Sequence, residues 1–176
     1  NEDLYNVYER VISEGKIDAG PWSPGVLADE LKQQIPEIRY ATGIWDYGEE
    51  ILFNVGDKKI HQVGIAADSD FFKMFNYELL KGAEDNALDD PTSIAVSRNM
   101  AVSLFGSVDA AYGNVLRMRN DRDLKITAVF ETIPDNASQQ FDFVVNWKEL
   151  LYDIPWLKVW IYRGPFTYVQ LHPGTD

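Results

Sequence analysis

Residues 66–106 constrain the fold of this chain more than any other segment. They place a cluster of aromatic residues, an acidic stretch and an apolar run in a fixed order. Asp68 or Ser69 suits the N-cap of a short helix that carries the aromatic residues. Ser97 suits the N-cap of a second helix, which ends at Gly106. We expect a packed structural joint with its acidic turn in solvent. Its predicted core residues are Phe71, Phe72, Phe75 and Phe105.

The remaining signals alternate between strand and helix and predict an α/β fold of the α+β kind with mostly short elements. A helix is expected after Ser23-Pro24, because a serine hydroxyl caps free amide groups and proline suits the first helical position. Apolar residues recur every four positions over 27–35 on this helix, and Pro36 ends it. Strands are expected over residues 4–12, 38–45, 124–130 and 141–145, and a hairpin over 51–66 around a turn at 56–59.

Composition narrows the function. The 176 residues, 45% of them hydrophobic, suffice for one domain or two small ones with a real core. A net charge of -12 makes nucleic acid and anionic membranes poor partners, since both are bound mainly through Lys and Arg. The absence of cysteine excludes disulfides and thiolate chemistry but fits a reducing cytosol and a disulfide-free periplasm equally.

The chain carries no sign of a membrane span or a signal peptide. No segment approaches the roughly 18 consecutive apolar residues that a spanning helix needs. The chain begins at Asn1 and ends at Asp176 just after an apparent strand, so we expect it to be part of a longer protein.

Acidic pairs are the first candidates for chemistry. Asp68-x-Asp70 and Asp121-x-Asp123 resemble fragments of cation sites, but neither has the spacing or the distal Glu of a calcium loop. Helix capping or a solvated turn is the favoured interpretation of both pairs. A solvated loop face is likewise favoured for the acidic run, which consists of Glu84, Asp85, Asp89 and Asp90.

No catalytic or cofactor-binding pattern emerges from the sequence. His61 and His172 are the only histidines, and neither has an acid and a nucleophile nearby. Nucleotide-binding glycine motifs and the hydrolase serine elbow are absent. We therefore predict no catalytic residue, no metal and no cofactor, and a protein that is not an enzyme.

Aromatic residues of the segment 147–166 form the best candidate for a binding role. Three interpretations are open: packing in the core, a partner surface, or a platform on which a sugar stacks. The last of these gives the alternative function of a secreted carbohydrate-binding or glycan-processing domain, whose glycan binding Trp156→Ala or Trp160→Ala would abolish. The residues predicted for a partner surface are Trp147, Trp156, Trp160 and Tyr162.

The ordered motifs over residues 66–145 resemble the extracytoplasmic core domain of MacB-like and FtsX-like ABC transporter permeases. The residues that carry the resemblance are Ser69 to Phe75, Leu79-Leu80-Lys81-Gly82, Ala87-Leu88 to Pro91, Ser93-Ile94-Ala95-Val96-Ser97, Ala101, Leu104-Phe105-Gly106, Gly113, Ile126-Thr127-Ala128-Val129-Phe130, Ile133-Pro134 and Phe141-Asp142-Phe143. Residues 5–11, 27–36 and 167–171 agree with the same family more loosely.

This resemblance implies two subdomains. A membrane-proximal βαβ unit of porter type would begin with residues 1–66. A sabre-like α/β unit would be inserted over 67–165, and residues 166–176 would start the return to the porter-like unit, which in the family continues with a helix and another strand.

The resemblance also implies a function without catalysis. The chain would be the periplasmic, extracytoplasmic domain of an inner-membrane permease. It would couple ATP-driven motion of the membrane helices to export, or to a periplasmic protein or exported substrate. The implied partners are a separate cytoplasmic ATP-binding subunit, reached through the membrane part, and a second permease copy in the full-length protein.

Overall fold

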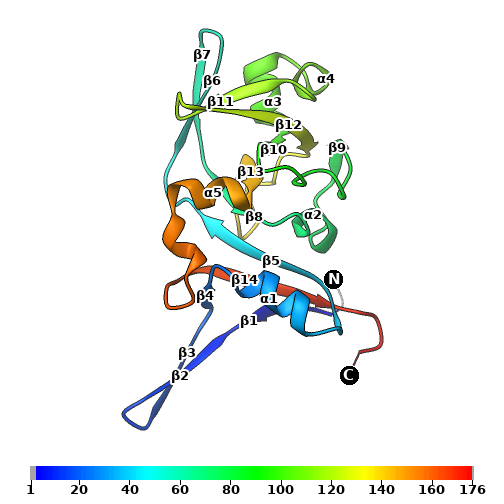
Figure 1. Ribbon diagram of the computed structural model, residues 1–176. Coiled ribbons are helices and arrows are strands. Elements are labelled where there is room, and N and C mark those ends of the chain that lie inside the picture. The colour runs from blue at the N-terminus through cyan, green and yellow to red at the C-terminus, as the bar shows by residue number, and fades with distance from the viewer. Residues whose placement is uncertain (1–2, 176) are drawn as a thin grey trace.

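One long mixed sheet organises the computed structural model, which describes residues 3–175 (Figure 1). Its strands are β1 (Leu4–Val7), β4 (Trp22–Pro24), β5 (Ile38–Asp46), β6 (Ile51–Val55), β7 (Lys58–Gln62), β8 (Gly64–Ala67), β9 (Leu79–Lys81), β10 (Ser93–Ser97), β11 (Val115–Met118), β12 (Arg122–Phe130), β13 (Phe143–Asn146) and β14 (Arg163–Leu171). They run in the order β1-β14-β5-β8-β13-β10-β12-β11-β6-β7, and β4 and β9 pair with β14 and β12 outside that path. The predicted α+β class is confirmed.

Helix α1 (Leu27–Gln34) covers the end of the sheet that carries both ends of the described chain. Here β1 pairs with β14, and the N–H of Leu171 donates to the carbonyl of Asp3 at 3.0 Å. A small core lies under the helix and contains Ala28, Ile38, Ala41 and Val169.

The start of this helix differs from the sequence prediction. The helix begins at Leu27 without a side-chain cap, and Ser23 instead lies in the short strand β4. The buried Ser23 hydroxyl donates to the carbonyl of Pro165 at 3.1 Å and lies 2.6 Å from the Thr167 hydroxyl. The hydrogen-bond acceptor lies 142 residues further along the chain, and the local sequence gives no sign of that partner.

The larger part of the sheet carries α2 (Phe71–Met74), α3 (Arg98–Phe105), α4 (Val108–Ala111), α5 (Trp147–Asp153) and the 3-10 helix η1 (Pro155–Lys158). The predicted helix between Ser97 and Gly106 is confirmed. The Ser97 hydroxyl accepts the N–H of Met100 at 3.1 Å, and Gly106 ends the helix with φ 85°. The aromatic joint is confirmed in part: Phe71 and Phe72 are fully buried and pack edge to face with ring centres 5.1 Å apart. Phe75 is partly buried against the same cluster, whereas Phe105 is partly buried against the other main cluster.

The predicted hairpin over residues 51–66 is correct only in its first part. β6 and β7 pair around Gly56, but the chain then leaves the edge of the sheet. β8 lies at the centre, antiparallel to β5 and parallel to β13. At the crossing a Cβ on Gly64 would lie 2.5 Å from the Phe143 ring, so the glycine permits β8 to approach β13 closely.

The predicted N-terminal strand over residues 4–12 is split at Tyr8. β1 joins the main sheet, whereas β2 (Glu9–Ser13) and β3 (Lys16–Gly20) form a separate two-stranded hairpin that projects from the body (Figure 1). Its turn contains Glu14 with φ 50° and Gly15 with φ 76°, the left-handed conformations that favour tight two-residue hairpins. The sequence analysis did not predict strands β3, β4, β9, β10 and β11.

Gly82 offers a test of the β9–β12 packing. Its φ is 87°, and an added Cβ would lie 2.5 Å from the backbone oxygen of Thr127. Gly106 has nearly the same φ of 85° but open space around its Cβ position. We expect Gly106→Ala to lower the free energy of unfolding by about 1 kcal/mol and Gly82→Ala by about 3 kcal/mol, because only the second adds a steric collision to the backbone strain. Urea denaturation of both variants checks this, and equal losses would contradict the predicted packing.

Candidate functional site

Exposed apolar side chains concentrate in two segments of the chain. Within residues 3–175 most of the exposed large hydrophobic residues belong to 5–22 and 152–162. They are Tyr5, Tyr8, Val11, Ile12, Ile17 and Trp22 in the first segment, and Tyr152, Trp156, Val159, Trp160, Ile161 and Tyr162 in the second. Because contiguous exposed apolar surface marks interaction sites more often than scattered apolar residues do, these two segments are the first places to look for one.

The second segment presents three of the four aromatic residues predicted for a partner surface. Trp156, Trp160 and Tyr162 are 40%, 52% and 50% exposed. The Trp156 ring is held edge to face by Trp45 at 6.0 Å and by Tyr162 at 5.5 Å between ring centres. Trp156 is therefore a positioned aromatic side chain with a free face.

Trp147 does not lie on this surface. It is 4% exposed and packs in the main core at the start of α5. Its ring comes within 3.5 Å of the Cβ position of Gly43 on β5. The predicted aromatic group is therefore divided between core and surface, and the membership of Trp147 in a partner surface is incorrect because the side chain is enclosed.

Arg163 joins the two exposed segments. Its guanidinium forms a bidentate ion pair with the carboxylate of Glu9 on the hairpin, and it also donates to the carbonyl of Ile161 at 2.8 Å. The hydrogen bonds from Arg163 lower the pKa of Glu9, and the same bonds raise the pKa of Arg163. β4 strengthens the junction, because Trp22 and Pro24 pair with Phe166 and Arg163 of β14.

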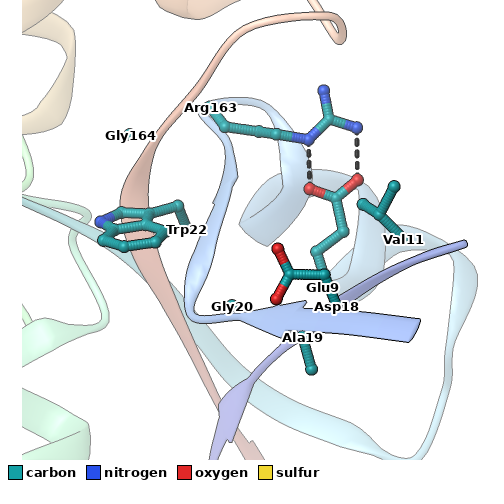
Figure 2. Close-up of a pocket in the computed structure, with 8 residues that line it drawn as sticks. All are labelled: Glu9, Val11, Asp18, Ala19, Gly20, Trp22, Arg163 and Gly164. Carbon is teal, nitrogen blue, oxygen red and sulfur yellow. Dashed lines mark hydrogen bonds and ion pairs between the residues drawn. The ribbon is translucent and has the colours of Figure 1, made fainter. Parts of the chain in front are cut away.

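A cavity of about 510 Å³ opens beside this ion pair (Figure 2). Its wall is largely apolar and comes from β2, β3, β4 and the beginning of β14. The lining residues are Glu9, Val11, Asp18, Ala19, Gly20, Trp22, Arg163 and Gly164. Figure 2 shows the carboxylate of Asp18 between the Glu9–Arg163 pair and the Trp22 ring. We call this cavity the hairpin pocket.

Two glycines fix the wall of the hairpin pocket. A Cβ on Gly20 would lie 3.2 Å from the Trp22 ring, and a Cβ on Gly164 would collide with the Trp45 ring at 2.5 Å. The backbone therefore lies directly against both indoles. Sequence reasoning missed this site, although the Gly15 turn between two short apolar runs was a usable hairpin signal.

The Asp68-x-Asp70 pair links α1, α2 and β5. Asp68 accepts the N–H of Gly43 at 2.7 Å, and its own N–H donates to the Thr42 hydroxyl at 3.1 Å. Asp70 is buried, pairs with Lys32 of α1 and Lys73 of α2, and accepts the N–H of Ala41 at 3.3 Å. The predicted cap by Asp68 or Ser69 is wrong: α2 has no side-chain cap, because these carboxylates serve other elements.

Burial changes the titration of Asp68. Desolvation raises its pKa to about 7, and the nearby carboxylates of Asp29 and Asp70 act in the same direction. A second cavity, of about 300 Å³, lies over this region and is also lined by Trp147 and Lys148.

The other candidates from the sequence remain apart. Asp123 pairs with Arg117 across β11 and β12 at 2.7 Å, and Asp121 lies 3.5 Å from Arg122. His61 is exposed on β7, and His172 is exposed beyond β14 at the other end of the sheet. The acidic run is solvated as predicted, with every member exposed: Glu84, Asp85, Asp89 and Asp90. Among residues 3–175 no group of three His, Asp or Glu side chains is arranged to hold a metal ion.

Comparison with known families identifies the fold. The family model of the MacB-like periplasmic core domain matches residues 2–176. The chain belongs to this family, as the sequence resemblance predicted. A comparison with curated protein sequences gives no match. In the part of the chain that the structure describes, no helix is both long and apolar enough to cross a membrane.

Three solved structures are similar to this chain. A domain of a Porphyromonas gingivalis protein assigned as a permease is 25% identical, with a TM-score of 0.77 over 99% of this chain and 77% of that one. The periplasmic region of MacB from Actinobacillus actinomycetemcomitans is 14% identical, with a TM-score of 0.59 over 85% of this chain and 64% of that one. The extracellular domain of the noncanonic ABC-type transporter YknZ from Gram-positive bacteria is 10% identical, with a TM-score of 0.64 over 97% and 84%. The last two likenesses show the fold alone.

The pKa of Asp68 predicts a measurable pH dependence. Between the ordinary value of 3.8 and about 7, folded Asp68 keeps a proton that the unfolded chain has released. Its contribution to the free energy of unfolding therefore falls as pH rises through this range. We expect Asp68→Asn, which retains an acceptor for Gly43, to be more stable than the parent by about 1–3 kcal/mol at pH 8 and nearly equal to it at pH 4.

Urea denaturation at pH 4, 6 and 8 measures this difference. Asp135→Asn, which changes an exposed carboxylate, is the matched control and should show no such trend. A pH-independent difference for Asp68→Asn would show that burial does not hold the proton on this side chain.

Proposed function

We propose that this domain is a non-catalytic, extracytoplasmic part of an ABC transporter permease in the inner membrane. It would couple ATP-driven motion of the membrane helices to export, or to a periplasmic protein or substrate. Membership in the MacB-like periplasmic core domain family supports this location and role. ATP would be hydrolysed by a separate cytoplasmic subunit, and two permease copies would form the full-length assembly.

The continuous sheet is the observation that carries the proposal. It runs without interruption from β1, beside both ends of the described chain, to the β6–β7 hairpin at the opposite end of the molecule (Figure 1). A displacement applied at the two chain ends would therefore pass through backbone hydrogen bonds to the far hairpin. A mechanical role needs this stiffness and no group of catalytic side chains.

We propose the subdomain division given by the family: residues 1–66 begin the porter-like unit, 67–165 form the sabre-like insert, and 166–176 start the return. β6 and all of β8 except its last residue belong to the first segment, and they pair with β11 and β13 of the second. The two units would thus move as one body. We also propose that Trp156, Trp160 and Tyr162 contact the periplasmic partner or exported substrate, since they are exposed on η1 and the loop that follows it.

The full-length gene provides a direct test of the membrane context. We expect it to encode one apolar span before Asn1 and three after Asp176. A gene that lacks these spans would contradict the permease assignment.

Coupling is tested by fluorescence distances in the full-length permease with its ATP-binding subunit. The domain has no cysteine, so Asp57→Cys in the β6–β7 turn can be labelled alone once any cysteines in the rest of the assembly are replaced. We expect ATP to change the distance between the labels of the two copies, because the far hairpin follows the membrane helices. The matched control carries both Glu37→Cys and Asp57→Cys in one copy, so that the two labels lie near opposite ends of the same sheet. The distance between these two labels should stay constant. A fixed distance between copies, or a changed distance within one copy, would oppose the lever.

A further inference from the structure

We infer that the hairpin pocket binds an extended segment of a protein partner that presents an aromatic or aliphatic side chain beside a lysine or arginine. This inference rests on the proposed function and specifies the partner chemistry of the same end of the domain. Three properties of the pocket lead to it: an apolar wall, one carboxylate that pairs with no cation among the described residues, and a hairpin whose outer edges are unpaired within residues 3–175.

The apolar wall provides room for a side chain. Val11 and Trp22 are 46% and 57% exposed. Gly20 and Gly164 also line the cavity, and neither has a side chain to fill it. The cavity of about 510 Å³ lies within the range of pockets that enclose small ligands. Since the Trp22 ring lies against Gly20, an entering aromatic or aliphatic group meets a flat apolar face.

The charge of the pocket indicates which residue should lie next to the apolar side chain in the bound segment. Glu9 and Arg163 neutralise each other through their paired hydrogen bonds. Among the described residues, no hydrogen bond or ion pair reaches the carboxylate of Asp18, which lies beside the same cavity (Figure 2). The pocket therefore has a net negative charge within a domain of net charge -12. A lysine or arginine next to the apolar anchor complements it.

The hairpin itself favours an extended segment. β2 pairs only with β3 in the described chain, so the outer edge of each strand has unpaired backbone groups. A two-stranded hairpin is only marginally stable in water, and a third strand adds hydrogen bonds to it. Extended peptides bind exposed strand edges in this way.

A lipid surface and a second copy fit the pocket less well. The hairpin tip carries Glu14 and Lys16, and charged side chains at a turn oppose insertion into a membrane. A second copy would bring another net charge of -12 and another Asp18 to the same place.

Two matched peptides test the proposal: acetyl-Thr-Phe-Lys-Val-Thr-amide and the same peptide with Glu in place of Lys. Each is titrated into the ¹⁵N-labelled 176-residue chain, whose dispersed amide spectrum first confirms that it is folded. We expect the lysine peptide to shift the amides of Ala19, Gly20 and Gly164, and to bind about five-fold more tightly than the glutamate peptide at low salt.

Three variants separate the two parts of the pocket. Asp18→Asn should abolish the preference for the lysine peptide, whereas Asp57→Asn, an exposed carboxylate at the far hairpin, should leave it intact. Val11→Ala should weaken both peptides by about the same factor of two to five, because it removes apolar contact alone.

Several results would overturn the proposal. Equal affinity for the two peptides, or no shift of the pocket amides on titration, would contradict it. So would shifts of those amides caused by phosphatidylcholine vesicles and not by the peptides. A dependence of the same amide shifts on domain concentration, with no peptide present, would also contradict it. The last two would assign the pocket to lipid or to a second copy. Each of these results leaves the ATP-dependent distance change in the full-length permease unaffected, so the two proposals can fail independently.

Discussion

The pairing of β5 on both of its edges is the constraint on which the rest of the structure depends. On one side β5 pairs with β14 over six residue pairs, and on the other with β8 over three. Ile44 takes part in both ladders and is buried at their junction. Removing β5 would leave β1, β4, β14 and α1 with no backbone connection through the sheet to the remaining strands. The backbone connection between the two parts of the sheet therefore depends on one nine-residue strand.

Side chains reinforce this junction at the place where β8 ends. Asp68 is bonded to Gly43 and Thr42 of β5, and Asp70 connects Lys32 of α1 with Lys73 of α2. Hydrogen bonds of this kind each contribute about 1 kcal/mol, and those to a charged group contribute more. The cost is the desolvation of Asp68, which raises its pKa, and the nearby carboxylates of Asp29 and Asp70 add to this rise. The junction is thus strengthened in part by Asp68, whose ionisation near neutral pH opposes it.

The accuracy of the sequence prediction depended on where each residue finds its partner. The cap at Ser97 and the end at Gly106 were predictable because both interactions close within the same helix. Ser23 and Asp68 are the same kinds of residue, but their partners lie on β14 and β5, and the local pattern does not contain them. The aromatic segment 147–166 shows the same limit, since composition alone does not distinguish the buried Trp147 from the exposed Trp160. The family was predictable because its motifs lie mainly in the packed interior.

Strand β14 connects the proposed docking region to the proposed mechanical path. Its first residue, Arg163, holds the hairpin through Glu9, and four residues later Thr167 pairs with Gly43 of β5. A segment bound in the hairpin pocket would pull on the strand that crosses the junction, because Arg163 and Gly164, which line the pocket, are the first two residues of β14. The effect is reciprocal: if partner binding changes the position of β14, the position of β14 changes partner binding by the same free energy. A shift of β14 during the transport cycle would therefore change the affinity of the pocket, and a bound partner would favour one position of the domain.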